Sequence, residues 1–430
     1  MELSRRRLIQ SGLLSLAAAG IGGTAACGGS GGTAAGSGGG TTELTLWYWG
    51  GGLSDKVVAD AVKQFAQTTL KPSVIGGDFK QKLIATMNGR KFVPDITGIK
   101  GENISSMLAE SDRFIDLNTL GADKLASQYV EWKWKQGSTT DGKLIGFPID
   151  IGPTALFYRD DIFEKAGLPS DPTEVGTSMS TWDTFFEAGV KLKKANPDAF
   201  IIDSAEGLFD KMVGQGPKRF IDESNKFIGD QPHIRGAWDM VIKANGLGVI
   251  APKYDGADWN AAAAQGKIAG TVGAAWFALD LKSGVEATSG KWRVAPMPSG
   301  PANIGGSFLA LPRECRDPQL AFQIVTWLLS ADNQARGFTD AALFPSTPAS
   351  YDLPALTGGD PFFGDQKTIE VFGPAAKNIP VQYEAPADAA VAQPFKDEII
   401  NVWTKGKNAD TAWTDAVSAA KQIAGRQGVS

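Results

Sequence analysis

Short apolar strands alternate with amphipathic helical patterns along this 430-residue chain. A strand at 43–49, a helix at 55–68, a strand at 72–75, a helix at 79–88 and a strand at 94–98 follow one another in this order. Such alternation is typical of an α/β fold in which helices cross over between the strands of a sheet. The helix at 55–68 shows the pattern most clearly, because five apolar residues recur at helical spacing: Val57, Val58, Ala61, Val62 and Phe65.

The first predicted strand ends in Trp47, Tyr48 and Trp49, and three glycines follow it at 50–52. Ligands of open α/β sheets bind outside the carboxyl ends of the strands, so this stretch occupies a position for a ligand. Neighbouring side chains of a strand point to opposite faces, which puts Trp47 and Trp49 on one face and Tyr48 on the other. We expect Trp49 to stack on a ligand, Trp47 to pack in the core and Tyr48 to lie at the rim of the site.

The first 26 residues resemble a bacterial export signal. Ser4 to Ile9, SRRRLI, is similar to the twin-arginine pattern, and Thr24 to Cys27, TAAC, resembles a lipobox whose cysteine is lipidated after cleavage. The alternative is a plain secretory signal with Cys27 as a bystander. Only Gly, Ala, Ser and Thr follow at 28–40. The sequence therefore predicts an extracytoplasmic protein, anchored through Cys27 by a Gly/Ser tether over 27–42.

Charge and length narrow the class of protein. Loss of the leader removes three arginines and one glutamate and takes the net charge from −5 to −7. This charge argues against nucleic acid or anionic lipid as the main partner. The chain is 43% hydrophobic and too long for a single core, so we expect two lobes. Cys315 has no disulfide partner if Cys27 is lipidated, and we expect it to be inert.

Six segments carry a resemblance to a known family. Gly142 to Asp150 reads GKLIGFPID, and Ala155 to Phe163 reads ALFYRDDIF. The other four segments are TWD at 181–183, QGKIAGTVGAAW at 265–276, GGSFLALP at 305–312 and AFQIVTWL at 321–328. Taken in this order along the chain, the six segments resemble the family 1 extracellular solute-binding proteins, the carbohydrate receptors of ABC importers.

The resemblance implies two α/β lobes joined by crossover strands, with a sugar held in the cleft between them as a hinge closes. It places the crossings near Ile151, near Gly305 and at 351–359. Lobe 1 would then comprise 43–150 with about 306–355, and lobe 2 would comprise 151–305 with about 356–430. The partners would be the sugar and separate permease chains in the membrane, and we expect a monomer without a cofactor.

A sugar site needs aromatic plates for the C–H faces of the ring and polar groups for its hydroxyls. By the resemblance, Trp276 is a stacking residue and Asp150 offers a polar group at the crossover. Asp78 opens a helix, so it is first an N-cap and only secondly a sugar acceptor. The remaining candidates lie in loops and segments that line the site in relatives: Lys100, Glu102, Gly306, Ser307, Phe344 and Tyr383.

Other classes of protein fit the sequence less well. A receptor of the same fold for a non-sugar solute, such as a polyamine or a phosphate ester, is the nearer alternative. A secreted glycoside hydrolase needs two carboxyl groups about 5 to 9.5 Å apart, which sequence does not measure. A metal site is not expected, because the single histidine, His233, lies where a loop enters a helix.

Overall fold

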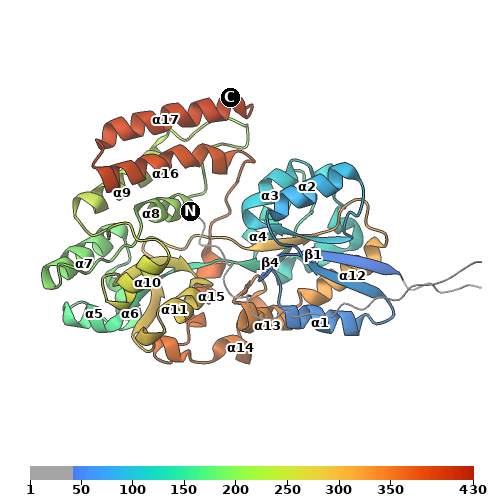
Figure 1. Ribbon diagram of the computed structural model, residues 1–430, viewed down its shortest axis with the longest axis horizontal. Coiled ribbons are helices and arrows are strands. Elements are labelled where there is room, and N and C mark those ends of the chain that lie inside the picture. Colours follow the sequence, from blue (N-terminus) through green and yellow to red (C-terminus); the bar gives the residue numbers. More distant parts are fainter. Residues whose placement is uncertain (1–41) are drawn as a thin grey trace, which may run out of the picture.

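The computed structural model describes residues 42–430, so the predicted export signal, Cys27 and the tether up to residue 41 lie outside the described residues. The described chain forms two bodies that lie side by side, each with its own β-sheet (Figure 1). The larger sheet has the strand order β2-β1-β3-β8-β4-β9, and the smaller has the order β6-β5-β7. The predicted α/β class is confirmed.

The large-sheet lobe comprises the six-stranded sheet and the helices packed on it. β1 pairs in parallel with β2 and β3, whereas β8 is antiparallel to β3 and β4. Its strands are β1 (Glu43–Tyr48), β2 (Thr69–Val74), β3 (Ile96–Lys100), β4 (Phe147–Ile151), β8 (Ser307–Ala310) and β9 (Phe344–Pro345). Its helices are α1 (Asp55–Gln64), α2 (Phe79–Gly89), α3 (Gly101–Leu108), α4 (Glu131–Gln136), α12 (Pro318–Leu328) and α13 (Ala331–Ala341).

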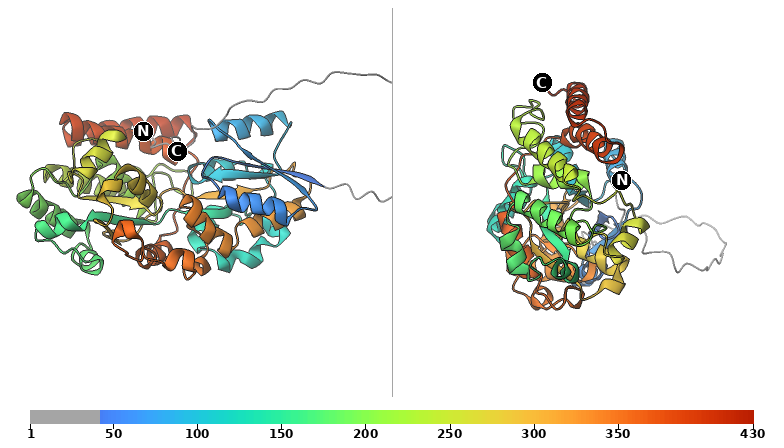
Figure 2. Two further views of the ribbon diagram at one scale, coloured as in Figure 1. Left: turned by 60° about the horizontal axis from the view of Figure 1, so that its bottom comes forward. Right: turned by 90° about the vertical axis from the view of Figure 1, so that its left-hand side faces the viewer.

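The small-sheet lobe comprises the antiparallel sheet β5 (Thr154–Arg159), β6 (Gly270–Ala274) and β7 (Trp292–Pro296) with its helices. The long helices α16 and α17 form a paired outer layer in both views of Figure 2. The helices are α5 (Asp160–Lys165), α6 (Pro172–Ser178), α7 (Trp182–Ala195), α8 (Ala205–Gly214), α9 (Pro232–Gly246), α10 (Ala257–Ala264), α11 (Phe277–Gly284), α15 (Ile369–Asn378), α16 (Asp388–Lys405) and α17 (Ala409–Arg426). The short helix α14 (Pro354–Thr357) contacts α13 of the large-sheet lobe.

Short 3₁₀ helices fill several of the connections. They are η1 (Ser111–Arg113), η2 (Leu117–Leu120), η3 (Ala122–Gln128), η4 (Glu286–Thr288), η5 (Pro348–Ser350) and η6 (Pro361–Phe363).

The start of the large sheet differs from the sequence prediction in its boundaries. α1 ends at Gln64 rather than at Thr68, and β2 begins at Thr69 rather than at Pro72. The β-branched pair Thr68-Thr69 disfavours a further helical turn, and Thr69 instead pairs with Glu43 of β1. β2 lies at the edge of the sheet, where Pro72 withholds an N–H group without breaking a ladder.

Two apolar clusters cover the two faces of the large sheet. Tyr48 packs in the cluster that includes α1 and α12, whereas Trp47 and Trp49 pack against the cluster that includes α2 and α3. The predicted division of the three aromatic residues between two faces is therefore confirmed. A third cluster begins at the small sheet and continues into the large-sheet lobe through Ile151 and Phe344.

The chain passes between the two sheets three times. β4 leads directly into β5 through residues 152–153, and the segment 297–306 returns from β7 to β8. The third passage follows β9 and reaches α15, which packs on β5 and β7. Figure 1 shows β4 extending from the large-sheet lobe toward the small-sheet lobe. Residues carried by these passages consequently lie between the two sheets.

Candidate functional site

Three predicted site residues lie side by side across neighbouring strands. Lys100, at the end of β3, is paired in register with Ser307 at the start of β8, and Ser307 is paired with Asp150 of β4. Asp150 and Ser307 are 2% and 6% exposed. Glu102 lies in the first turn of α3, with its Oε1 atom 3.8 Å from Lys100 Nζ. We call this row, with the adjoining residues 304–306, the junction, because it lies where the chain passes between the sheets.

Glycines bring the backbone segments of the junction into close contact. Gly305 and Gly306 have φ values of 85° and 83°, a left-handed conformation that glycine adopts without steric cost. The N–H of Gly101 donates to the carbonyl oxygen of Gly306 at 2.7 Å. A Cβ atom on Gly101 would overlap that same oxygen, and one on Gly152 would overlap the carbonyl oxygen of Ile304. Larger residues at these positions would push the passages apart.

Trp276 lies against the same passage from the small-sheet lobe. Its Nε1–H donates to the carbonyl oxygen of Ile304 at 3.2 Å, and its ring is half-buried. A Cβ atom on Gly305 would lie 3.8 Å from Nε1. The ring therefore lies beside the junction and stays partly accessible, which is what stacking on a ligand requires.

Lys133 is a junction residue that sequence reasoning missed. Its side chain is fully buried, with Nζ 3.7 Å from the centre of the Phe308 ring and 3.1 Å from Gln136 Oε1. A Cβ atom on Gly306 would lie 2.8 Å from Nζ, so the amine lies directly behind the junction. Burial lowers the pKa of Lys133 to about 7, and negative charge nearby partly offsets this effect. The sequence feature that could have indicated its burial is its position between two tryptophans, at Trp132-Lys133-Trp134.

The groups that act on the Lys133 amine come from both lobes. They are, in decreasing order of their effect on its pKa, Asp150, Glu384 and Glu102. Glu384 belongs to the small-sheet lobe, because the neighbouring Gln382 donates to carbonyl oxygens at the end of α8. The charge of Glu384 in the small-sheet lobe thus raises the pKa of Lys133 in the other lobe.

Tyr383 and Glu384 share a loop that the small-sheet lobe holds firmly. Glu384 pairs with Arg219 at 2.8 Å. Asp388 accepts the N–H groups of Ala385 at 2.6 Å and Phe220 at 3.0 Å, and burial raises the pKa of its carboxyl group to about 6. Tyr383 is half-buried and packs against the core of this lobe. Glu384, which the sequence analysis did not single out, adjoins the predicted residue.

The burial of the two strand-end tryptophans is the reverse of the prediction. Trp49 is 8% exposed, packs edge-on against Phe79 at 5.3 Å between ring centres, and lies close to the backbone of Gly98. Trp47 is only partly buried. Lys100 Nζ lies 5.6 Å from the centre of the Trp49 ring. Trp49 thus packs in the core behind Lys100, because Gly98 leaves the space that its ring occupies.

Burial corrects two further expectations, and a hydrogen bond confirms a third. Tyr48 is 4% exposed rather than at a rim, because its face of the strand meets α1, and its hydroxyl donates to Asp55 Oδ1 at 2.9 Å. Phe344 is 1% exposed and packs on Tyr351, so it belongs to the core and not to a wall of the site. Asp78 is exposed and accepts the N–H of Gln81, as its predicted N-cap role requires.

Metal and thiol chemistry find no support in the described chain. Within residues 42–430, His, Cys, Asp and Glu side chains form no group of three or more that could hold a metal ion. His233 lies in the first turn of α9, and its Nε2 atom is 2.8 Å from the carbonyl oxygen of Arg219. Burial raises the pKa of Cys315 to about 12, which keeps it a thiol. Over the same residues, no helix combines the length and the apolar character needed to cross a bilayer.

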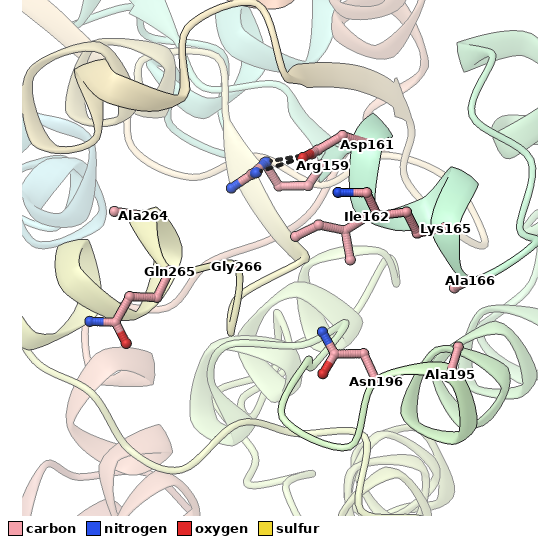
Figure 3. A pocket seen from close by; sticks show the side chains of 10 residues that line it. All are labelled: Arg159, Asp161, Ile162, Lys165, Ala166, Ala195, Asn196, Ala264, Gln265 and Gly266. Carbon is pink, nitrogen blue, oxygen red and sulfur yellow. Dashed lines mark hydrogen bonds and ion pairs between the residues drawn. The ribbon is translucent and has the colours of Figure 1, made fainter.

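A hollow of about 240 Å³ lies in the small-sheet lobe and contains none of the predicted site residues (Figure 3). Its most buried charged group, Arg159, donates from Nε and Nη2 to Asp161 at 2.8 and 2.9 Å and from Nη1 to the Ala263 carbonyl oxygen. These bonds occupy the guanidinium group, which indicates a structural role for it. The lining residues are Arg159, Asp161, Ile162, Lys165, Ala166, Ala195, Asn196, Ala264, Gln265 and Gly266.

Comparison with known proteins gives consistent matches. The family described as bacterial extracellular solute-binding protein matches residues 56–363. A crystal structure titled as an extracellular solute-binding protein of family 1 is similar with a TM-score of 0.83 and 28% identity, over 89% of this chain and 100% of that one.

Two curated relatives cover most of the chain at lower identity. The arabinooligosaccharide-binding protein of Bacillus subtilis is 24% identical over 311 residues, which is 66% of this chain and 69% of the relative. The lactose-binding protein of Rhizobium radiobacter is 24% identical over 364 residues, 79% of this chain and 83% of the relative.

Proposed function

Because this chain belongs to the bacterial extracellular solute-binding proteins, the receptors of ABC transporters, we propose that its solute is a sugar, bound at the junction and delivered to a membrane permease made of separate chains. It is a binding protein and not an enzyme. The two relatives described above are named for oligosaccharide and disaccharide ligands, which supports a sugar as the solute.

The observation that carries the proposal is the row of polar groups at the junction. Lys100, Ser307 and Asp150 follow one another across three strands, and Glu102 and Lys133 lie beside and behind them. A sugar presents hydroxyl groups that both donate and accept hydrogen bonds, so carboxylates, amines and a hydroxyl in one row match its rim. Hydrogen bonds to charged partners contribute about 1.5 to 3 kcal/mol each.

Trp276 supplies the apolar part of the proposed site. Its half-buried ring offers a flat surface for the C–H face of a pyranose, and its bond to Ile304 fixes the orientation of that surface. Trp276 and Glu384 belong to the small-sheet lobe, whereas Lys100 and Glu102 belong to the other. A solute that contacts both sets favours the arrangement in which the lobes are close together, because it binds that state more tightly.

A panel of solutes tests the proposal through thermal stability and calorimetry. The panel contains monosaccharides, arabino-oligosaccharides, lactose, maltose, sn-glycerol 3-phosphate and spermidine. A ligand present at 100 times its Kd stabilises the folded chain by about 2.7 kcal/mol, which gives a clear rise in Tm. A sugar is expected to raise Tm, and Asp150→Asn is expected to reduce its affinity.

Two results would contradict the proposal. A Tm rise with spermidine or sn-glycerol 3-phosphate and with none of the sugars would show a non-sugar receptor. Sugar binding that Asp150→Asn and Ser307→Ala leave unchanged would show that the solute binds away from the junction.

A further inference from the structure

Phe92 stands out from the surface of the large-sheet lobe. Its side chain is 91% exposed, whereas the other exposed large apolar side chains of residues 42–430 reach 56% at most. It lies just after α2, and the backbone at Arg90 and Phe92 is left-handed, with φ values of 48° and 58°. Non-glycine residues adopt this conformation uncommonly. The segment 90–93 therefore projects an aromatic ring into solvent, away from any core.

This segment lies where the N-terminal part of the chain joins the fold. β1 and β3 are parallel, with Leu46 opposite Ile96, so the residues just before β3 lie beside the first residues of β1. The N–H of Thr45 donates to Asp95 Oδ2 at 2.7 Å, which fixes this alignment. The beginnings of β1 and β2 form the outer end of the lobe, at the right-hand side of Figure 1 and away from the other sheet. We call this end the entry edge.

Charged side chains of both signs lie around the entry edge. Three of the acidic groups are paired: Glu43 with Lys71, Asp95 with Arg316 and Glu110 with Arg113. Arg90 and Lys91, next to Phe92, and Arg313 are exposed and make no ion pair with another residue of 42–430. Glu314 is the exposed acidic neighbour of Arg313. Two exposed basic side chains, Arg90 and Lys91, thus directly precede the ring in the sequence, on a chain whose net charge is −5.

We propose that the entry edge rests on an anionic membrane, with Phe92 in the interfacial region of the lipid and Arg90 and Lys91 at the head groups. An exposed aromatic ring flanked by basic side chains is a combination that binds lipid interfaces. A single projecting ring without a surrounding apolar surface fits the deformable interface of a lipid layer better than it fits a rigid apolar pocket on a protein. The described chain begins at this same edge with Thr42, 15 residues after the predicted lipid site at Cys27.

The contact would orient the receptor as well as hold it. Anionic lipid attracts Arg90 and Lys91 and repels the acidic remainder of the molecule, so the end that carries Phe92 is the end that faces the membrane. The predicted anchor at Cys27 would keep the entry edge close to the membrane. The contact itself does not depend on which solute binds at the junction.

Vesicle binding of the chain 28–430, which lacks Cys27, tests the contact itself. Co-sedimentation is measured at low salt with vesicles of phosphatidylglycerol and phosphatidylcholine and with vesicles of phosphatidylcholine alone. Binding to the anionic vesicles is expected to fall roughly tenfold in Phe92→Ser and roughly 30-fold in Arg90→Gln/Lys91→Gln. Leu247→Ser, which removes a 42% exposed side chain of the other lobe, is the matched control and should bind like the wild type.

A fluorescent label reports which end of the lobe meets the lipid. A Cβ atom on Gly89 or on Gly50 meets no other atom within 4 Å, so both positions accept a cysteine. Gly89 lies beside the entry edge, and Gly50 lies at the opposite end of β1. An environment-sensitive dye at Gly89→Cys should shift to the blue on anionic vesicles, and the same dye at Gly50→Cys should not. The native Cys315 is buried and stays unlabelled.

Three outcomes would overturn the proposal. One is equal vesicle binding by Phe92→Ser and the wild type, and another is an equal shift of both dyes. The third is no vesicle binding by the wild type together with Phe92-dependent binding to membranes that contain the permease, which would assign the entry edge to a protein partner.

Discussion

Trp276 and Trp49 differ in accessibility, and this difference predicts opposite effects of truncation. Trp49 packs in the core, so Trp49→Ala is expected to cost about 3 to 5 kcal/mol of folding free energy. Trp276 is half-buried beside the junction, so Trp276→Ala is expected to change stability little and to weaken solute binding roughly 5- to 150-fold, equivalent to about 1 to 3 kcal/mol. Denaturant unfolding and calorimetry on both variants measure the two effects. A stable Trp49→Ala protein with lost affinity would restore Trp49 as the ligand plate.

Lys133 gives the stability of the protein a defined dependence on pH. Its pKa is about 7 in the folded chain against an ordinary value of 10.5, so between these values the unfolded state binds more protons. Stability from this group is fully present above pH 10.5 and is lost as the pH falls toward 7. From pH 7 to 9, the unfolding free energy should rise by about 1 kcal/mol per pH unit relative to Lys133→Met. Parallel urea titrations of the two proteins would contradict this expectation if their pH profiles coincided.

For individual residues, the sequence predicted the face of a strand but not the burial of a side chain. Strand parity separated Tyr48 from its two neighbours correctly, because alternation is a property of every strand. It did not say which tryptophan is covered, since that depends on Gly98, a residue of another strand. Lys133 escaped notice for a similar reason, because its burial depends on Phe308 and Gly306 far along the chain.

Among the connections between elements, the passage after β4 leaves little room for a larger residue. The N–H of Gly152 donates to Asn303 Oδ1 at 2.9 Å, and its carbonyl oxygen accepts the N–H of Ile304 at 2.9 Å. A methyl group at Gly152 would overlap the Ile304 carbonyl oxygen. Gly152→Ala is therefore expected to cost about 1 to 3 kcal/mol of stability through backbone displacement. Gly50→Ala, where a Cβ atom meets nothing, is the control and should change stability by less than about 0.5 kcal/mol. Thermal denaturation of the two variants measures both changes in stability.

Helix and strand types were predictable near the start of the chain, and their ends were less so. Apolar periodicity identified α1 and α2 and the strands β1 and β3, since each buries one face or both, whereas β2 buries only Leu70. The end of α1 and the start of β2 depend on the pairing of Thr69 with Glu43, a contact between distant residues that local pattern does not contain.

For the whole molecule, the proposed binding between lobes predicts a change of shape. A solute that contacts both lobes should reduce the radius of gyration of the chain 28–430, because it favours the state in which the lobes are closer. Small-angle scattering with and without a saturating sugar measures this change. If calorimetry proves binding and the radius stays constant, the solute contacts one lobe or the lobes are already closed.

Anchoring is a second property of the whole molecule. The predicted lipid site at Cys27 implies that Cys27→Ala releases the protein from cell membranes into the medium while its thermal unfolding and solute affinity stay unchanged. Fractionation of cells that express the variant measures the release. Full membrane retention would argue against a lipid anchor at Cys27, and the same cells carrying Phe92→Ser would then show whether the entry edge alone retains it.

Both edges of the six-stranded sheet are unsuited to adding a strand from another molecule. β2 carries Lys71 and Pro72 near its centre, so it offers a charge and lacks one N–H group, while β9 at the opposite edge is only two residues long. Charge, proline and shortness are the features by which natural sheets avoid edge-to-edge growth. Receptors crowded on a cell surface would therefore remain separate particles, and Pro72→Val should increase the tendency of concentrated solutions to form β-rich aggregates.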